Sequence, residues 1–141
     1  GKVGIKDSLL AKPGRLLGYE RSQINRHPSI GAGIVETIKD SHKIIRGILE
    51  HHERFDGKGY PNRLKGRAIS LEGRIIAVAD AFDALTTHRP YQRKYSAKEA
   101  FFEIKKGSSR QFDPVVVRAF MLSFSKHPMV WKAARFKGHR T

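Results

Sequence analysis

The segment from Leu71 to Leu85 limits the fold more than any other part of this sequence. After Leu71 and the break Glu72-Gly73-Arg74, its apolar residues form a nearly continuous run from Ile75 to Leu85, interrupted by Asp80 and Asp83. Ser70, directly before the segment, can act as a helix N-cap, and an acidic Glu72 suits the first helical turn. A helix that is apolar around most of its circumference needs neighbours on most sides. We therefore expect a central helix here that the rest of the chain covers.

Helix signals occur along the rest of the chain, whereas strand signals do not. Regular alternation of apolar and polar residues is absent, and the short run Val115–Val117 follows an Asp-Pro pair that is typical of a helix start. The sequence therefore predicts an all-α fold. The other expected segments are a turn at Asp7–Leu10, a weakly capped helix from Leu17 that Pro28 ends, a helix from Ile30 to about Lys39, a helix that Ser41 caps, and helices that begin at Ser96 and Asp113.

Length, charge and the lack of cysteine narrow the function. The 141 residues suit one domain, and no apolar run is long enough to cross a membrane. The absence of cysteine leaves His, Asp and Glu as possible metal ligands and permits a reducing, cytoplasmic setting; no signal peptide is recognisable. The 28 Lys and Arg against 13 acids give a net charge of +15, which attracts phosphate groups. No motif or aromatic stacking platform for nucleic acid accompanies this charge. We expect a helical domain over residues 1–125 and a basic tail over 126–141.

Three features carry possible chemistry. His51 and His52 are adjacent at a helix end, before the glycine-rich segment Asp56–Pro61, and adjacent helical side chains point about 100° apart. Such a pair can serve neighbouring metal ions or one ion at a frayed helix end, or it can be an ordinary helix terminus. Asp80 lies in the most apolar stretch, where a carboxylate pairs with a cation or a buried arginine. With His27, these residues form a nitrogen and oxygen ligand set suited to Fe, Mn, Ni or Zn.

Several segments, taken in order, resemble the signature of the HD-GYP phosphohydrolases over about residues 1–120. The block from His51 to Pro61, His-His-Glu-Arg-Phe-Asp-Gly-Lys-Gly-Tyr-Pro, is the most specific of them. The other matching segments are Lys12-Pro13-Gly14, Arg26-His27-Pro28, Asp80–Leu85, Arg89-Pro90-Tyr91 and Phe112-Asp113-Pro114.

The resemblance implies a fold, a reaction and a metal centre. The family is an HD-domain helical bundle, here of about six helices, and most members hydrolyse cyclic di-GMP through a metal-activated water. Two or three divalent metal ions are implied, with Fe, Mn or Ni favoured over Zn. His27, His51 and His52 match three ligands of one metal, and Asp80 matches a ligand of its neighbour.

The resemblance also implies substrate contacts and partners. Lys2 matches a lysine that faces the scissile phosphate, and Arg89, with Arg93 or Lys94, matches residues that meet the dinucleotide. Lys58 is suited to phosphate, and the loop Gly59-Tyr60-Pro61 lies beside the site. The implied partners are a cyclic dinucleotide, GGDEF-domain proteins and an upstream sensory or receiver domain.

One departure from the family pattern bears on activity. Gly1 matches the glycine of the family's His-Asp-x-Gly-Lys motif, and no His-Asp pair occurs in this sequence. We therefore expect a chain truncated just after that pair, weak or inactive by itself. The alternative is a truncated or degenerate domain that binds a cyclic dinucleotide or a GGDEF partner without turnover.

Overall fold

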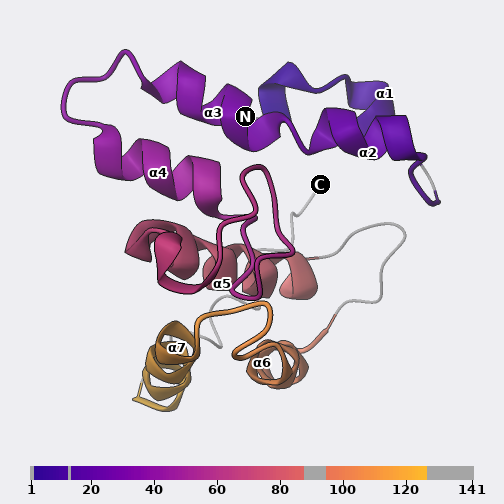
Figure 1. The fold of residues 1–141 in the computed structure, drawn as a ribbon. Helices are drawn as coiled ribbons and strands as arrows, with labels where there is room; N and C mark the ends of the chain where they lie inside the picture. The colour runs from indigo at the N-terminus through magenta and orange to yellow at the C-terminus, as the bar shows by residue number, and fades with distance from the viewer. Residues whose placement is uncertain (1, 13, 88–94, 127–141) are drawn as a thin grey trace, which may run out of the picture. The chain divides into compact units, whose positions relative to one another are not determined.

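The computed structural model describes residues 2–12, 14–87 and 95–126, which are almost entirely helices and loops. Six of the described helices have seven or more residues, and the described residues contain no strand, only a single bridge between Ser108 and Phe112. The expected all-α fold of about six helices is confirmed. The elements, shown in Figure 1, are η1 (Lys2–Gly4), α1 (Asp7–Leu10), α2 (Gly18–Ile24), α3 (His27–Val35), α4 (His42–Glu50), η2 (Gly66–Ala68), α5 (Leu71–Thr86), α6 (Ala97–Lys106) and α7 (Pro114–Lys126).

The chain divides into two compact units, Gly1–Ala77 and Val78–Thr141, and α5 contributes residues to both. None of the described helices is long and apolar enough to cross a membrane. Of the expected basic tail, residues 127–141 lie outside the described part of the chain.

In the first unit, α3 packs against α4, and η1 packs against α3. Figure 1 shows α3 and α4 side by side, joined by the loop that follows Val35. The contact between η1 and α3 is close, because a Cβ at Gly4 would lie 2.9 Å from Cγ2 of Ile30. Pro28 is buried in the first turn of α3, where a missing N–H costs no helical hydrogen bond.

The start of α5 is fixed by α4 and by its own cap. A Cβ at Gly47 on α4 would lie 2.8 Å from Cδ1 of Ile76, so glycine lets the two backbones approach. Ser70 accepts a hydrogen bond from the Gly73 N–H through its hydroxyl (3.1 Å), which confirms its predicted role as N-cap. The backbone N–H of Ser70 donates in turn to the buried carboxylate of Glu50.

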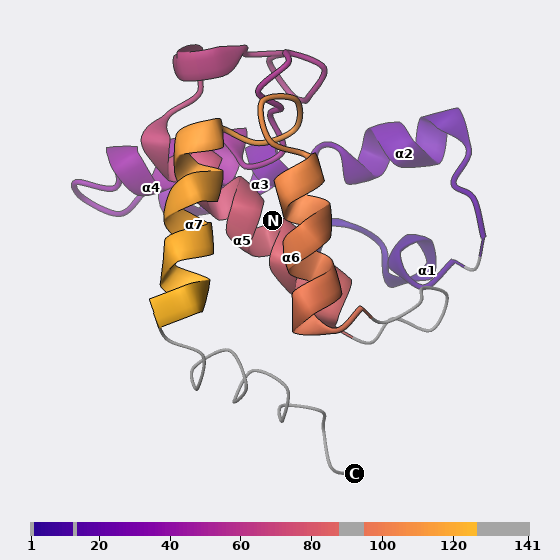
Figure 2. The same ribbon diagram turned by 90° about the horizontal axis from the view of Figure 1, so that it is seen from below.

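In the second unit, α6 packs against α7, and both views place these helices beside each other (Figure 2). Phenylalanine rings contact one another in this unit: the half-buried Phe120 lies 5.4 Å from the buried Phe82 and 6.1 Å from Phe101, centroid to centroid. The predicted cap of α6 is present, since Ser96 accepts the Glu99 N–H and Glu99 accepts the Ser96 N–H.

Two predictions about helix boundaries were wrong. The helix expected to run to Lys39 ends at Val35, and Asp40 takes a positive φ of 59° that turns the chain toward α4. The helix that Pro28 was expected to end stops at Ile24 instead, and the proline lies within the next helix. Ser41 precedes α4 as expected, but its side chain makes no capping hydrogen bond.

The expected burial of α5 on most sides was also wrong. Leu71, Ile75 and Ile76 are 53%, 49% and 38% exposed, while Val78 and Phe82 are buried. The N-terminal half of the helix meets α4 through the small residue Gly47 and the stem of Glu72, so its apolar side chains are not all turned inward. An apolar run predicts that a helix has a buried face, but it does not say which apolar residues form that face.

Candidate metal centre

Three of the four predicted metal-ligating residues meet in the first unit. His27 is the first residue of α3, and His51 and His52 directly follow α4. The packing of α3 against α4 brings one side-chain nitrogen of each histidine within 4.8 Å of the others. His27 is buried and the pair is half-buried, so the cluster lies at the edge of the interior.

Backbone carbonyls orient two of the three imidazoles. Nδ1 of His27 lies 2.8 Å from the carbonyl oxygen of Ile24, and Nδ1 of His51 lies 2.6 Å from that of Ile48. A carbonyl can only accept, so each Nδ1 carries the proton and each Nε2 keeps its lone pair. Metal-ligating histidines use this arrangement: one ring nitrogen, here Nδ1, donates to the protein, and the other, here Nε2, is available to the ion.

The spacing of the nitrogens also fits a metal ion. Nε2 of His52 lies 3.1 Å from Nε2 of His27. Imidazole nitrogens that bind one Zn²⁺-like ion at about 2.0–2.1 Å lie about 3 Å from one another. The donor set, three imidazoles from two packed helix ends, can therefore hold one divalent ion.

Burial and nearby positive charge keep the imidazoles of His27 and His52 neutral. Burial lowers the pKa of His52 from 6.5 to about 3, and the positive charges of His51, His27 and Lys2 add to this shift. Burial likewise lowers the pKa of His27, helped by His51 and Lys2, while the hydrogen bond to Ile24 opposes the shift. A neutral imidazole is the form that binds a metal, so few protons compete for these nitrogens.

Lys2 lies near the histidines, as its effect on the pKa values of His27 and His52 indicates. It is an exposed residue of η1, which packs against α3. Its ammonium group therefore adds a positive charge at the edge of the histidine cluster.

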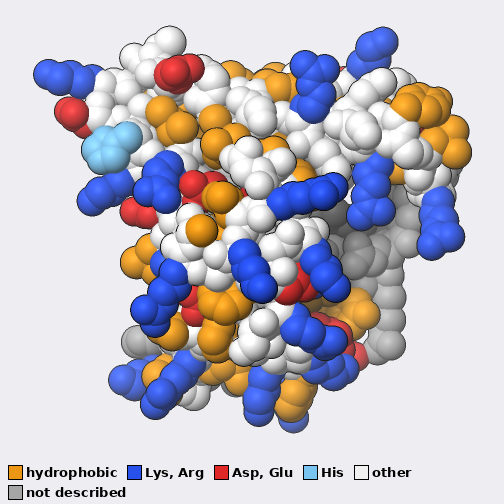
Figure 3. All heavy atoms as spheres, in the orientation of Figure 1, with side chains coloured by type: hydrophobic (Ala, Val, Ile, Leu, Met, Phe, Trp, Pro, Cys, Tyr) orange, Lys and Arg blue, Asp and Glu red, His pale blue; other side chains and the backbone are white. Residues whose placement is uncertain are grey.

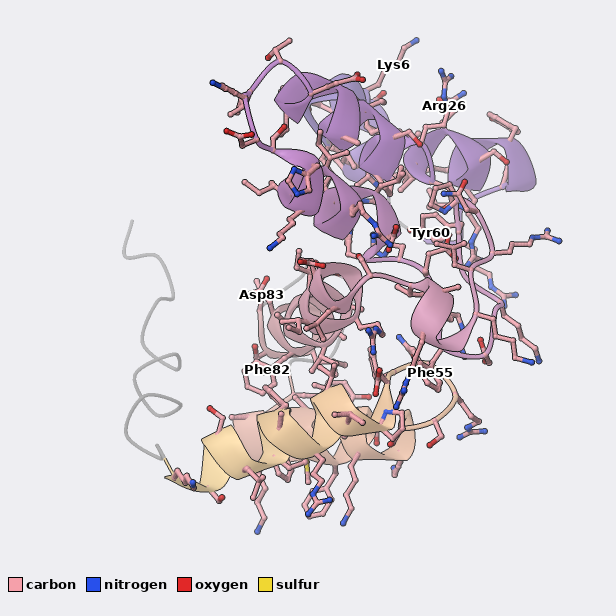
Figure 4. All side chains as sticks on the ribbon, turned by 60° about the vertical axis from the view of Figure 1, so that its left-hand side comes forward. Lys6, Arg26, Phe55, Tyr60, Phe82 and Asp83 are labelled. Atoms are coloured by element: carbon pink, nitrogen blue, oxygen red, sulfur yellow. The ribbon has the colours of Figure 1, made fainter. Side chains whose placement is uncertain are left out.

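The predicted loop beside the site begins immediately after the histidines. Lys58 is exposed, Gly59 is buried, and the peptide bond between Tyr60 and Pro61 is cis. The ring of Tyr60 stacks on that of His52, with centroids 4.9 Å apart and planes inclined by 27°. Figure 4 labels Tyr60 and Phe55 on this loop.

Two predicted residues are not placed at the cluster. Asp80 is half-buried on α5 in the second unit, so its pairing with the histidines stays a prediction. Arg89, together with Arg93 and Lys94, lies outside the described residues. Asp83, also on α5 and labelled in Figure 4, accepts a hydrogen bond from the Thr87 hydroxyl at 3.3 Å.

Sequence reasoning missed the two buried glutamates that flank the histidine pair. Glu50 is 6% exposed and holds the start of α5, and Glu53 is 3% exposed and accepts two backbone N–H groups of the loop. A glutamate on each side of the pair, next to a glycine-rich loop, was the signal available in the sequence.

Two curated relatives cover most of the chain. A cyclic di-GMP phosphodiesterase of Vibrio cholerae serotype O1 is 43% identical over 97% of this chain and 29% of its own length. A cyclic di-GMP phosphodiesterase of Thermotoga maritima is 44% identical over 86% of this chain and 33% of its own length. The chain thus spans about a third of the length of the relatives it matches.

A solved structure and a family model agree with the fold. The crystal structure of a cyclic GMP-AMP specific phosphodiesterase of V. cholerae matches 92% of this chain and 36% of its own, with a TM-score of 0.59 and 24% identity. The model of the HD domain family matches residues 1–116, which include the three histidines. The chain belongs to the HD domain family, in its HD-GYP branch.

Proposed function

We propose that this chain is the catalytic domain of a metal-dependent phosphodiesterase that hydrolyses cyclic di-GMP. The observation that carries the proposal is the convergence of His27, His51 and His52, with two of their Nδ1 atoms held by carbonyls, in a member of the HD domain family. The names of the relatives, cyclic di-GMP phosphodiesterases, support the substrate.

In this proposal, residues of the first unit bind either the metal ion or the substrate. The three imidazoles hold a divalent ion through Nε2, and Lys2 places its ammonium where it offsets charge on the phosphate that is cleaved. Lys58 reaches the anionic substrate from an exposed position on the loop. When bound, divalent ions lower the pKa of water and neutralise phosphate charge.

The finer parts of the proposal come from the family resemblance. Asp80 would hold a neighbouring ion, and Arg89 would contact the dinucleotide. Two or three ions of Fe, Mn or Ni, rather than Zn, would occupy the complete centre. GGDEF-domain proteins and an upstream sensory or receiver domain are the proposed partners.

Metal content tests the centre directly. His27→Ala removes one of three nitrogen ligands and should lower the Mn²⁺ retained per chain severalfold in elemental analysis. The matched control is His42→Ala, because His42 is an exposed residue of α4 outside the cluster and should leave the metal content unchanged. Equal metal content in both variants would contradict the proposed centre.

Turnover tests the reaction. The chain, and a version extended upstream by a segment designed to supply the His-Asp pair of the family motif, are each incubated with Mn²⁺ and cyclic di-GMP, and the products are separated by chromatography. We expect hydrolysis by the extended version and little by the shorter one. Tight binding of the dinucleotide with no hydrolysis by either would instead support the binding-only alternative.

A further inference from the structure

His52 differs from the other two histidines in how its ring is oriented. Nδ1 of His27 and Nδ1 of His51 each meet a backbone carbonyl. In the part of the chain that the structure describes, no such hydrogen bond forms at Nδ1 of His52. Its ring neighbours within the cluster are His51 and His27, with centroids 4.0 and 4.8 Å away, and outside the cluster the ring of Tyr60 stacks on it at 4.9 Å. Tyr60 is thus the contact from outside the cluster that can orient the His52 imidazole.

Tyr60 reaches His52 because the loop folds back on its own beginning. The Tyr60 N–H donates to the His52 carbonyl at 3.2 Å. One residue earlier, the outgoing leg of the loop (residues 52–58) touches its returning leg (residues 59–64). A Cβ at Gly59 would lie 2.3 Å from the Arg54 nitrogen and 2.6 Å from the His52 carbonyl oxygen. The returning leg thus lies directly against the histidine pair.

The carboxylate of Glu53 holds that returning leg. One of its oxygens accepts the Asn62 N–H at 2.6 Å and the other accepts the Leu64 N–H at 3.0 Å. The side chain is 3% exposed, and a charged acceptor makes both hydrogen bonds stronger than neutral ones. Glu53 follows His52 in the chain, so a single residue ties the end of the loop to the backbone of the cluster.

Asp56, the other carboxylate of the loop, holds a different part of it. Asp56 accepts the Lys58 N–H at 3.1 Å and pairs with Arg54, with nitrogen to oxygen distances of 3.0 and 2.8 Å. These bonds shape the outgoing leg of the loop, before Gly59. Glu53, in contrast, holds the returning leg, which carries Tyr60.

We infer that Glu53 is a positioning residue for the histidine cluster. The two hydrogen bonds from the Asn62 and Leu64 N–H groups to its carboxylate, called the clasp below, keep the Tyr60 ring on His52. This stack turns Nε2 of His52 toward Nε2 of His27. The inference rests on the proposed function only in taking the cluster as a metal site. Glu53 itself acts at a distance from the ion, through the loop.

The first test needs no metal. In the proton NMR spectrum of the metal-free chain, the Tyr60 ring current should shift the His52 ring protons upfield of those of the exposed His42. Glu53→Gln puts an amide NH₂ against one of the two backbone donors, so it breaks one bond of the clasp at constant size. We expect the His52 signals to move toward those of His42.

The control is Glu20→Gln in the same unit. Glu20 is also buried, and it accepts a backbone N–H, from Leu17 at 2.8 Å, as well as a bond from Lys12. Its loss should lower the unfolding temperature without moving the His52 signals. Tyr60→Leu serves as the second variant, because it removes the ring itself and leaves the clasp in place.

The second test measures affinity for Co²⁺ from its visible absorption. Loss of a residue that orients a ligand costs about 10- to 100-fold in metal affinity, and we expect such a loss for Glu53→Gln and no change for Glu20→Gln. If Glu53 acts through Tyr60, the double variant Glu53→Gln/Tyr60→Leu should lose no more affinity than the worse single variant.

The outcomes separate this inference from the proposed function. If the unaltered chain binds no Co²⁺, the proposed metal centre fails, while the NMR comparison still decides the role of Glu53. Unchanged His52 signals in Glu53→Gln would overturn the inference whether or not metal binds. Equal losses of Co²⁺ affinity in Glu53→Gln and Glu20→Gln would overturn it as well, since they would show a general effect of stability.

Discussion

At the scale of single residues, Gly59 illustrates how closely the loop packs behind the histidines. The three atoms nearest to a Cβ at this position, all under 3 Å away, belong to the backbone of residues 52–54, which cannot rotate away as a side chain can. Gly59→Ala must therefore separate the two legs of the loop. We expect a loss of about 1–3 kcal/mol in the free energy of unfolding, measured with urea.

Gly33 provides the matched control for that substitution. It lies on α3, and a Cβ there would meet nothing within 4 Å. Alanine is the better helix former, so Gly33→Ala should stabilise the chain by about 0.5–1 kcal/mol. If the two substitutions changed stability with the same sign, the close contact at Gly59 would be wrong.

The lowered pKa values of His27 and His52 predict how stability depends on pH without metal. Both groups bind protons less readily in the folded chain than the ordinary pKa of 6.5 implies, and for His52 the folded value is about 3. Between pH 6.5 and the lower pKa values of the folded state, the unfolded chain binds more protons than the folded chain. The free energy of unfolding therefore falls as pH falls below 6.5. From about one pH unit above 6.5, where both histidines are deprotonated in the folded and unfolded chain alike, they add no pH dependence.

Thermal unfolding between about pH 5 and 6.5 checks this, since most carboxylic acids stay ionised in that window. The unfolding temperature of the metal-free chain should decrease toward pH 5. His52→Gln removes one of the buried groups and should flatten the decrease. An equally steep decrease in that variant would show that the histidine is not the cause.

For the histidine cluster, the sequence predicted the ligand residues but not the groups that orient them. The motif identified His27, His51 and His52, and the structure brings them together. The carbonyls of Ile24 and Ile48 that orient two of the rings could not be foreseen, because every residue has a carbonyl and only the local helix geometry selects these two. Glu53 was missed for a similar reason, since its role depends on a closed loop.

At the scale of helices, local capping chemistry predicted starts better than periodicity predicted ends. Ser70 and Ser96 both cap the helices that follow them, because a side chain three residues from its backbone partner needs no tertiary contact. The end of α3 and the exposed side chains of α5 depend instead on which neighbours pack nearby. The apolar stripe of residues 30–38 continues past Val35, but the helix does not.

The cap of α6 gives a prediction at this scale. Ser96→Ala removes the acceptor for the Glu99 N–H and leaves half of the capping box. We expect a loss of about 1 kcal/mol in the free energy of unfolding, by urea denaturation. Ser29→Ala, at an exposed position of α3, should change stability far less. Equal effects would mean that the cap contributes nothing.

For the molecule as a whole, the dominant physical property is its charge. Lys and Arg outnumber Asp and Glu by 28 to 13, and blue side chains are spread over the face seen in Figure 3. Even if every acid paired with a base, 15 cations would have no acidic partner. Such an excess attracts anionic ligands and also makes the folded chain repel itself.

This self-repulsion predicts that added salt stabilises the chain. Raising the ionic strength from about 0.01 M to about 0.15 M shortens the screening length from about 30 Å to about 8 Å, which weakens repulsion across the whole surface. The same salt weakens ion pairs such as Lys12–Glu20 and Arg54–Asp56, but partly exposed pairs contribute at most about 1 kcal/mol each. The unfolding temperature should therefore rise with NaCl.

Equal ionic strengths of NaCl and KCl distinguish screening from the binding of a particular cation. Screening depends on ionic strength alone, so both salts should raise the unfolding temperature equally. Lys105→Glu, which reverses one exposed charge on α6, lowers the net charge by two and should make the rise smaller. A fall in the unfolding temperature with either salt would mean that attractive pairs outweigh the net repulsion, contrary to the charge count.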